Sequence, residues 1–249
     1  MRERVRALAG LAEEIRARPY ARAVRLVAVD GRGGAGKSTL ARALAAACGG
    51  APVVRVDDFL YWRDIEGWWP RLEREALRPL LAGLPARFRV RDWANDPLGQ
   101  GLGRWAMVPP AEVVIVEGVT SSRQAISADL ALALWVHAPR GERLRRAIGR
   151  DGPQRRSLWI EWMRLEDEFF GRDGAAERAD HVVCGQPRMP CDPATQAVLL
   201  DSRLAAARCV IRPAHPHARH VPLGICGRSG QPAPRPPGAS ILWPVHRAA

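Results

Sequence analysis

The stretch GRGGAGKS, residues 31–38, constrains the fold of this chain more than any other part of its sequence. Four of the six positions 31–36 are glycine, and Lys37, the one lysine in the chain, follows them. Glycines allow positive φ angles and let backbone amides approach an anion, and a helix beginning at Lys37 would add further free amides. The stretch fits the spacing G-x-x-x-x-G-K-[ST] and lies between a Val/Leu strand and an Ala/Leu helix, as a phosphate-binding loop does. We therefore expect a nucleoside triphosphate site here.

Each residue type in this loop has an expected part in holding a triphosphate. Lys37 would reach the β- and γ-phosphates, the hydroxyl of Ser38 would ligate Mg²⁺, and Thr39 would lie near the α-phosphate. The backbone amides expected to cradle the phosphates belong to Gly31, Gly33, Gly34, Ala35 and Gly36. The alternative interpretation is a glycine-rich turn that binds nothing, and the strand-to-helix context argues against it.

Hydrophobic patterning along the first 183 residues alternates between strands and helices. Expected strands cover residues 24–29, 53–56, 112–119, 130–139 and 179–183, and expected helices cover 3–17, 37–48, 71–82, 141–150 and 157–170. Helix 71–82 is expected to bend or end early at Pro79. Two strand-like stretches, 87–93 and 103–108, are expected to pair as a hairpin outside the main sheet. The alternation predicts an α/β fold of the P-loop NTPase type, with three α/β/α layers around a mostly parallel central sheet.

Residues 184–249 differ in composition from the rest of the chain. They hold 11 of the 21 prolines, four of the five cysteines and no glutamate, and only residues 193–207 show helical periodicity. Proline-rich sequence of this kind is typical of extended or disordered segments. We therefore expect a P-loop domain over residues 1–183, followed by a poorly structured Pro/Arg-rich tail over residues 184–249.

Charge and apolar runs bear on the protein's partners and location. The formal net charge is +12, but the excess is divided about evenly between these two regions and forms no basic stripe, so a nucleic-acid partner is not favoured. The longest apolar runs, such as residues 130–136, are too short to span a membrane. The charged N-terminal sequence shows no secretory signal, and the five cysteines have no disulfide-framework spacing. We expect a cytoplasmic protein with a small-molecule substrate, and the sequence indicates no oligomeric state.

The sequence VDDF, residues 56–59, places two carboxylates at the end of the second expected strand. Because neighbouring parallel strands end at the same edge of a sheet, Asp57 and Asp58 are expected beside the γ-phosphate. A carboxylate there can accept the proton of an attacking hydroxyl, as a kinase requires. A helix cap or a solvated turn is the alternative role for such a pair. A GTPase is excluded, because its guanine-reading N-K-x-D needs a second lysine.

In its ordered motifs the chain resembles the uridine kinase-like branch of the small-molecule P-loop kinases, which also includes phosphoribulokinase-like and bacterial pantothenate kinase-like enzymes. The matching segments are VDGRGGAGKSTLA (29–41), VDDF (56–59), RLEREALRPLLAG (71–83), RDW (91–93), VVIVEGV (113–119), LALWVHAP (132–139), RLRRAIGRDG (143–152), WIEWMRLEDEFF (159–170) and ADHVV (179–183). The phosphate-binding loop alone is generic, whereas the carboxylates after the second strand and the Arg-rich segment indicate this branch.

The resemblance implies an ATP- and Mg²⁺-dependent kinase that phosphorylates a hydroxyl of a nucleoside-like molecule, most specifically the 5′-OH of uridine or cytidine. It makes Asp57 the general base and Glu117 the carboxylate that, with Ser38, holds Mg²⁺. The Arg-rich segment becomes a small lid, in which Arg146 and Arg150 fit the pattern R-x-x-x-R-D of phosphate-contacting arginines. A solvated basic helix face is the alternative for any one of the lid arginines, which are Arg143, Arg145, Arg146 and Arg150.

Departures from the family's pattern gather in the acceptor region, where the hairpin is expected. The departing positions are Leu60, Trp68, Trp69, Arg91 and His137. Asp64 or Glu66 would be an imperfect substitute for the family's sugar-contacting Asp. Asp92 and Trp93 remain, and Trp93 is a candidate to stack on a planar acceptor, although tryptophans such as those at 62, 68, 69 and 105 more often pack in cores or hairpins. Phosphoryl transfer is therefore better supported than the identity of the acceptor.

Three other functions stay open on the sequence. A kinase for another hydroxylated metabolite, such as pantothenate or a phosphosugar, would share the loop and differ in the acceptor region. A nucleotide-binding regulator without turnover would use the acceptor region and the tail for partner contacts. A nucleic-acid-dependent ATPase is the weakest of the three, because it rests on the net charge alone.

Overall fold

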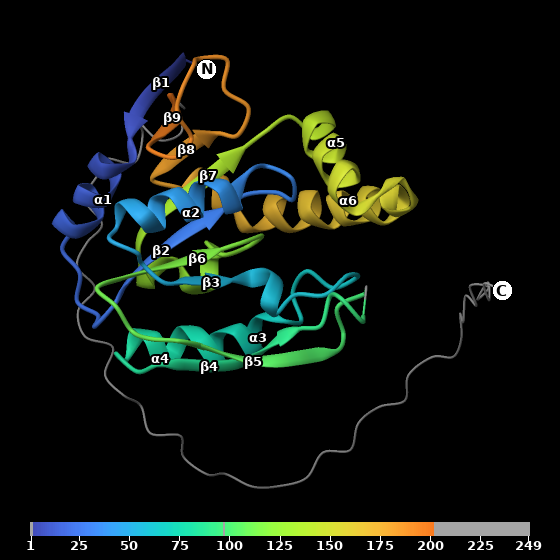
Figure 1. Ribbon diagram of the computed structural model, residues 1–249, viewed down its shortest axis with the longest axis horizontal. Coiled ribbons are helices and arrows are strands. Elements are labelled where there is room, and N and C mark those ends of the chain that lie inside the picture. Colours follow the sequence, from blue (N-terminus) through green and yellow to red (C-terminus); the bar gives the residue numbers. More distant parts are fainter. Residues whose placement is uncertain (1, 97, 202–249) are drawn as a thin grey trace, which may run out of the picture. The chain divides into compact units, whose positions relative to one another are not determined.

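The computed structural model describes residues 2–96 and 98–201, which form a seven-stranded sheet and a separate two-stranded sheet. The strands of the large sheet are β1 (Arg2–Ala7), β2 (Arg25–Asp30), β3 (Val53–Arg55), β6 (Val113–Glu117), β7 (Leu130–His137), β8 (His181–Cys184) and β9 (Gln196–Asp201). Their order is β1-β9-β8-β7-β2-β6-β3 (Figure 1). Neighbours from β3 to β8 pair in parallel, whereas β9 is antiparallel to both β8 and β1. The predicted α/β fold with a mostly parallel sheet is confirmed.

Helices cover both faces of this sheet, which is why its central strands are apolar at nearly every position. Along β2, Val27 and Val29 pack with helices α1 (Leu8–Ala17) and α2 (Lys37–Ala47). Leu26 and Ala28 belong to the second buried cluster, on the opposite face. The elements of that face include α6 (Arg156–Asp173) and α7 (Ala175–Arg178), and α5 (Arg140–Asp151) packs against α6. The predicted helices at 37–48, 141–150 and 157–170 are therefore confirmed, with small shifts at their ends.

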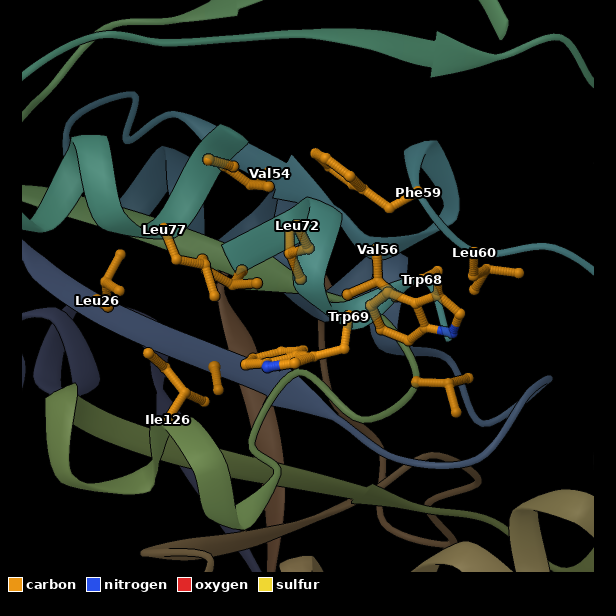
Figure 2. Close-up of a cluster of buried hydrophobic side chains, with 14 of the residues drawn as sticks. Leu26, Val54, Val56, Phe59, Leu60, Trp68, Trp69, Leu72, Leu77 and Ile126 are labelled. Atoms are coloured by element: carbon orange, nitrogen blue, oxygen red, sulfur yellow. The ribbon is translucent and has the colours of Figure 1, made fainter. Parts of the chain in front are cut away.

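The helical stretch from Trp69 to Leu81 consists of α3 (Trp69–Leu72), a π turn (Glu73–Leu77) and α4 (Arg78–Leu81). The π turn ends two residues before Pro79, which has no amide hydrogen to donate to the preceding turn, and the helical stretch does not end at this proline but continues to Leu81. Trp69, Leu72 and Leu77 of this stretch face the sheet and pack in one buried cluster (Figure 2).

The two-stranded sheet is the hairpin of β4 (Ala86–Arg91) and β5 (Leu102–Val108), which lies outside the main sheet as predicted. Phe88 of β4 is buried and its ring lies 4.6 Å from that of Phe59, centroid to centroid. This contact attaches the hairpin to the turn that follows β3, and so places it at the edge of the site.

Two sequence expectations are wrong, and both concern the antiparallel strands β1 and β9 at one end of the main sheet. The expected helix 3–17 begins only at Leu8, because residues 2–7 form β1 and pair with β9. The expected tail begins too early, because Gln196–Asp201 form β9, with Val198 and Leu199 buried, where helical periodicity had been inferred for residues 193–207. The main sheet therefore extends to residue 201, and the rest of the expected tail lies outside the described residues.

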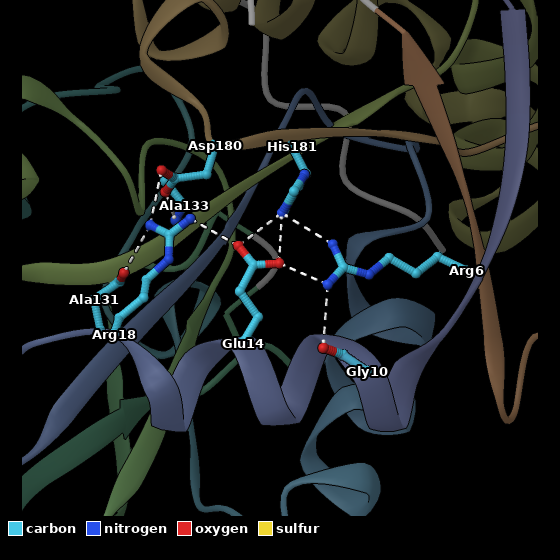
Figure 3. Close-up of polar contacts among 8 residues, drawn as sticks. All are labelled: Arg6, Gly10, Glu14, Arg18, Ala131, Ala133, Asp180 and His181. Carbon is cyan, nitrogen blue, oxygen red and sulfur yellow. Dashed lines mark hydrogen bonds and ion pairs between the residues drawn. The ribbon is translucent and has the colours of Figure 1, made fainter. Parts of the chain in front are cut away.

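A network of charged side chains joins α1 to the start of β8 (Figure 3). Glu14 pairs with Arg6 at 2.7 Å and with Arg18 at 2.8 Å, and it also contacts the ring nitrogen of His181 at 3.0 Å. Arg18 continues the network to Asp180 at 2.9 Å. These contacts fix the N-terminal strand and helix to the end of the sheet that lies away from the phosphate-binding loop.

No helix in the described part of the chain is both long and apolar enough to cross a membrane.

Candidate active site

The loop from residue 31 to residue 36 connects β2 to α2, and its backbone requires glycine. Gly34 has a φ of +78°, and a Cβ atom there would collide with the carbonyl oxygen of Arg143. Gly36 is the left-handed residue immediately before α2, with φ of 105°. Lys37 is 7% exposed, and its Nζ donates a hydrogen bond to the carbonyl oxygen of Arg32 at 3.1 Å. The predicted strand–loop–helix context of a phosphate-binding loop is present.

A cavity of about 700 Å³ lies where β2, β3 and β6 end. The predicted residues that line it are Gly33, Gly34, Gly36, Lys37, Ser38, Thr39, Asp57, Trp93, Glu117, Arg146 and Arg150. Three predicted residues do not line it. Gly31 lies against the backbone of Val136, Ala35 is fully buried, and Asp92 binds the side-chain amide of Asn95 at 3.0 Å.

Ser38 and Glu117 form a pair of oxygen donors on one side of the cavity. The Ser38 hydroxyl donates to Oε1 of Glu117 at 3.1 Å, and Glu117 is the last residue of β6 and is 5% exposed. Burial raises the pKa of Glu117, and the nearby Asp57 carboxylate raises it further, although Lys37 and Ser38 favour the ionised form. A buried carboxylate with a raised pKa, a hydroxyl beside it and a second carboxylate nearby suit a cation that prefers oxygen ligands, such as Mg²⁺.

Asp57 lies in a single 3₁₀ turn, Val56–Asp58, at the end of β3, and its side chain is exposed to the cavity. Three successive carbonyl oxygens of this turn each accept a side-chain hydrogen bond. Trp93 Nε1 donates to Asp57 at 2.9 Å, Arg71 donates to Asp58 at 3.4 Å, and Arg91 Nε donates to Phe59 at 2.8 Å. The backbone that carries the candidate base is thus held from both the hairpin and the helical stretch Trp69–Leu81.

These contacts revise the expectations for two hairpin residues. Arg91, a departure from the family's pattern, holds the turn through Phe59 and lies over the ring of Tyr61 at 5.0 Å. Trp93 lines the cavity as predicted, but its indole nitrogen is already used by the carbonyl of Asp57. Only the ring face of Trp93 therefore remains for an acceptor.

Arg146 and Arg150 are the two arginines of the Arg-rich segment that line the cavity. Arg146 donates to the carbonyl oxygens of Gly34 at 3.4 Å and Gly185 at 3.0 Å, so it bridges the phosphate-binding loop and the segment after β8. Arg150 pairs with the adjacent Asp151 at 2.7 Å. Contacts within the protein therefore hold the Arg146 guanidinium beside the loop and the Arg150 guanidinium in the wall of the cavity.

The other two arginines of this segment lie elsewhere. Arg145 points outward and binds Glu142, whose pKa is lowered to about 2 by hydrogen bonds from Arg145 and then Arg146. Arg143 is buried against Glu166, with N–O distance 3.2 Å. The expectation that all four arginines form one lid is therefore too broad, since α5 directs them to three different environments.

Tryptophans from α6 and from two loop segments form the wall of the cavity on the acceptor side. Trp159 and Trp162 are buried on α6, and the ring of Trp62 meets both edge-on, at centroid distances of 5.1 and 5.3 Å. All three line the cavity together with Trp93. The other candidate platforms do not: Trp68 and Trp69 are core residues, and Trp105 is exposed under the guanidinium of Arg87.

The two imperfect substitutes for a sugar-contacting Asp also point elsewhere. Asp64 accepts hydrogen bonds from the Tyr61 hydroxyl at 3.0 Å and from the backbone amide of Gly67 at 2.7 Å. Glu66 pairs with Arg172 on α6 at 2.7 Å. Neither residue lines the cavity, whose acidic side chains are Asp57, Asp58, Glu117 and Asp151.

No protein-family model matches the chain, and no curated protein matches it significantly. Among solved structures, a possible uridine kinase from Bacillus stearothermophilus aligns with a TM-score of 0.51 at 20% identity, covering 70% of this chain and 96% of that one. The chain has the fold of the uridine kinase-like P-loop kinases. A candidate fructose transport system kinase from Silicibacter sp. TM1040 aligns at 23% identity with a TM-score of 0.45, covering 69% of this chain and 94% of that one.

Within this P-loop kinase fold, one buried carboxylate that the sequence reasoning missed lies at the end of β2. Asp30 is fully buried and accepts hydrogen bonds from the amides of Gly31 at 2.6 Å and Thr120 at 2.8 Å, and from Ser122 at 2.8 Å. Burial raises the pKa of Asp30, against the effect of these hydrogen bonds. Thr120 has φ of 67°, unusual for a β-branched residue, and Asp30 holds it there. Asp30 thus joins the start of the phosphate-binding loop to the turn after Glu117.

A second missed residue is Glu166, which belongs to the matching segment 159–170 but carries no expected role there. It is the one carboxylate on the otherwise apolar buried stripe of α6, which also contains Trp159, Trp162 and Phe169. A charged residue at such a position in an amphipathic helix is the sequence signal that could have found it. It contacts the phosphate-binding loop directly, as described below.

Proposed function

We propose that this protein is a kinase that transfers the γ-phosphoryl group of ATP to a hydroxyl group of a small molecule. The observation that carries the proposal is the composition of one cavity, where the phosphate-binding loop, Asp57, Glu117 and two arginines of α5 meet. The solved structure from Bacillus stearothermophilus that shares this fold is described as a possible uridine kinase, which supports the same class of reaction. We expect the acceptor hydroxyl to be the 5′-OH of a pyrimidine nucleoside, uridine or cytidine.

The residues of the loop fit a triphosphate and a magnesium ion. The amides at the start of α2 and the ammonium group of Lys37 provide positive charge where the phosphates would bind. Ser38 and Glu117 are the residues that would hold Mg²⁺, directly or through water. When bound, Mg²⁺ supplies neutralisation of phosphate charge.

The remaining cavity residues then have distinct tasks in the transfer. Asp57 would accept the proton of the acceptor hydroxyl. The oxygen of that hydroxyl would bond to the γ-phosphorus as the bond between the γ-phosphorus and the ADP oxygen breaks. Arg146 and Arg150 would stabilise the negative charge that spreads over the transferred group. The carbonyl contacts from Trp93 and Arg91 keep the backbone of Asp57 in place, which supports positioning of the base.

The tryptophan wall supports an acceptor with a planar part. Aromatic rings bind flat groups by stacking and exclude water from the reacting hydroxyl. Trp62 and Trp93 come from the acceptor side, close to Asp57 in the same cavity. A nucleobase carrying its ribose 5′-OH is the acceptor class that suits both features, whereas pantothenate, an acyclic acceptor, would leave the rings unused.

The experiment that tests the proposal is identification of the phosphorylated product. The protein is incubated with ATP, Mg²⁺ and a metabolite extract, and mass spectrometry is used to search for a compound heavier by about 80 Da, one phosphoryl group. Purified uridine, cytidine, pantothenate and phosphosugars are then compared by ADP release. Lys37→Met serves as the control without transfer. ATP binding with no phosphorylated product from any acceptor would overturn the kinase proposal in favour of a nucleotide-binding regulator.

A further inference from the structure

Glu166 of α6 holds a peptide group of the phosphate-binding loop from outside the cavity. Its Oε1 accepts a hydrogen bond from the amide of Gly33 at 2.6 Å, and from Nε1 of Trp162 at 2.8 Å. The same peptide group, between residues 32 and 33, presents its carbonyl oxygen to Nζ of Lys37 at 3.1 Å. Because the N–H and C=O of a trans peptide point in opposite directions, one planar group connects Glu166 to Lys37.

Arg143 of α5 holds the next peptide group of the loop. Its NH1 pairs with Oε2 of Glu166 at 3.2 Å and approaches the carbonyl oxygen of Gly33 at 3.5 Å. A carbonyl fixed toward Arg143 directs the amide of Gly34 the opposite way. Gly34 lines the cavity, so this amide is one of those available to a phosphate.

The cost of burying the ion pair of Arg143 and Glu166 argues against a purely stabilising role. The side chains of Arg143 and Glu166 are 5% and 0% exposed. Desolvating two charges costs several kcal/mol per ion, so an apolar pair of similar size is often as stabilising or more so. Burial accordingly raises the pKa of Glu166, while the amide of Gly33 and the charges of Lys37 and Arg143 favour its ionised form. Both charged side chains contact the backbone of the phosphate-binding loop, which gives them a role other than stabilising the core.

We propose that Glu166, paired with Arg143, is a positioning residue for phosphate binding: it fixes the orientation of the loop peptides and, through one of them, the ammonium group of Lys37. This inference rests on the proposed function. It also connects the loop to α5, since Arg146 and Arg150 follow Arg143 on the same helix and line the cavity. Movement of α5 would therefore be transmitted to Lys37 through Arg143 and Glu166.

The test compares ATP affinity, by calorimetry with Mg²⁺, with thermal stability in a set of variants. Glu166→Gln leaves Arg143 buried without a counter-charge, so we expect loss of both stability and ATP affinity, the latter at least about tenfold. The double variant Arg143→Met/Glu166→Gln contains no unpaired buried charge, and we expect it to regain thermal stability. Its ATP affinity should remain at least about tenfold below wild type, because the loop peptides have lost their charged partners.

Asp167→Asn is the matched control. Asp167 follows Glu166 on α6 and also bridges the loop and α5, through Arg32 at 2.9 Å and Arg140 at 2.5 Å, but it is exposed. Exposed ion pairs are screened by water and salt, so ATP affinity should change by less than about twofold.

Wild-type ATP affinity in a double variant of restored stability would show a structural role only and overturn the proposal. Should the double variant not fold, Trp162→Phe tests the same atom, because it removes the indole donor to Oε1 of Glu166 and keeps an aromatic ring in place. We expect ATP to bind it several-fold more weakly, and affinity equal to wild type contradicts the proposal. Absence of ATP binding by the wild type would overturn the proposed function, and this inference with it.

Discussion

The phosphate end and the acceptor end of the cavity are built in different ways. At the phosphate end, backbone amides and buried charges make the site, and the residues concerned are held by hydrogen bonds in the protein interior. Lys37 and Glu117 are 7% and 5% exposed, and Glu166 is fully buried. At the acceptor end the site consists of side chains, Asp57 among them, that project from a short turn, a hairpin and α6.

This contrast suggests different tasks for the backbone and the side chains of the proposed site: the backbone suits triphosphate binding, and the side chains suit recognition of the acceptor. Backbone geometry can bind any triphosphate and tolerates little change, because glycine at positions such as 34 is required by the fold itself. Side chains in loops can be exchanged without changing that geometry, and two of the departures from the family's pattern, Leu60 and Arg91, lie at or beside this end of the cavity. On the proposed function, we therefore expect the phosphate end to set the class of reaction and the acceptor end to select the substrate.

The largest expected effect is at the phosphate end. Lys37→Met removes the ammonium group that lines the cavity at the start of α2, and we expect phosphoryl transfer to fall by about 10³-fold or more. Thermal unfolding should change little, since the methionine can fill the same space. Steady-state kinetics with the identified acceptor measures the first effect. Residual transfer within tenfold of wild type would mean that the loop is not the site of catalysis.

At the acceptor end, Asp57→Asn should lower turnover by about 10²–10⁴-fold, as expected for loss of a general base. Affinity for ATP, measured by calorimetry, should remain as in wild type, because Asp57 belongs to the other end of the cavity. Asp58→Asn is the matched comparison, and we expect less than tenfold loss of turnover. The reverse ranking would reassign the base to Asp58, whose pKa is raised by burial and by the nearby Asp57.

Trp93→Phe tests the support of the acceptor end. The change removes the hydrogen bond from Nε1 to the carbonyl of Asp57 while keeping an aromatic ring. A hydrogen bond of this kind contributes about 1 kcal/mol, so a loss of about fivefold in kcat/KM is expected, with ATP affinity unchanged. Trp105→Phe, on the exposed side of the hairpin, should have no effect, and equal losses in the two variants would argue against this role.

The smallest expected effect concerns the contribution of Glu117 to the folding stability of the protein. Its pKa is raised in the folded state, so its ionisation opposes folding: stability falls as pH rises above the ordinary value of 4.5, and the loss is complete above the raised value. Glu117→Gln removes this effect and should raise the melting temperature at neutral pH by about 2–4 °C, equivalent to about 1 kcal/mol in a domain of this size. The gain should shrink toward pH 4.5 in thermal scans. A gain independent of pH would show that ionisation of Glu117 is not its cause.

The same contrast describes what could be predicted from the sequence. The loop, Lys37 and the strand-end carboxylates are signalled by local spacing, and the structure brings Asp57 and Glu117 to one cavity because parallel strands end at the same edge. The strands β1 and β9 could not be predicted from local sequence, because each is a strand through its pairing with the other, about 190 residues away in the chain. In residues 3–17, the apolar positions of a short strand and of the following helix merged into one apparent helical period.

Contacts over long sequence distance also explain the missed site residues. The sequence around Glu166 does not indicate a contact with Gly33, which is 133 residues away in the chain. The carboxylate meets the amide of Gly33 because α6 packs against the loop. In the same way, the departure at Arg91 acquires a role only when the hairpin is folded against the turn after β3. Local motifs thus predict the reacting groups, and the fold determines what holds them.

The most direct test of the account is a crystal structure of the protein with Mg²⁺ and a non-hydrolysable ATP analogue. The account predicts a terminal phosphate at Lys37 with the Asp57 carboxylate facing it. An acceptor oxygen should fit between them, within about 3.5 Å of the phosphorus and about 3.2 Å of the carboxylate. A triphosphate bound away from the loop, or an Asp57 side chain too distant for one oxygen to bridge, would contradict it.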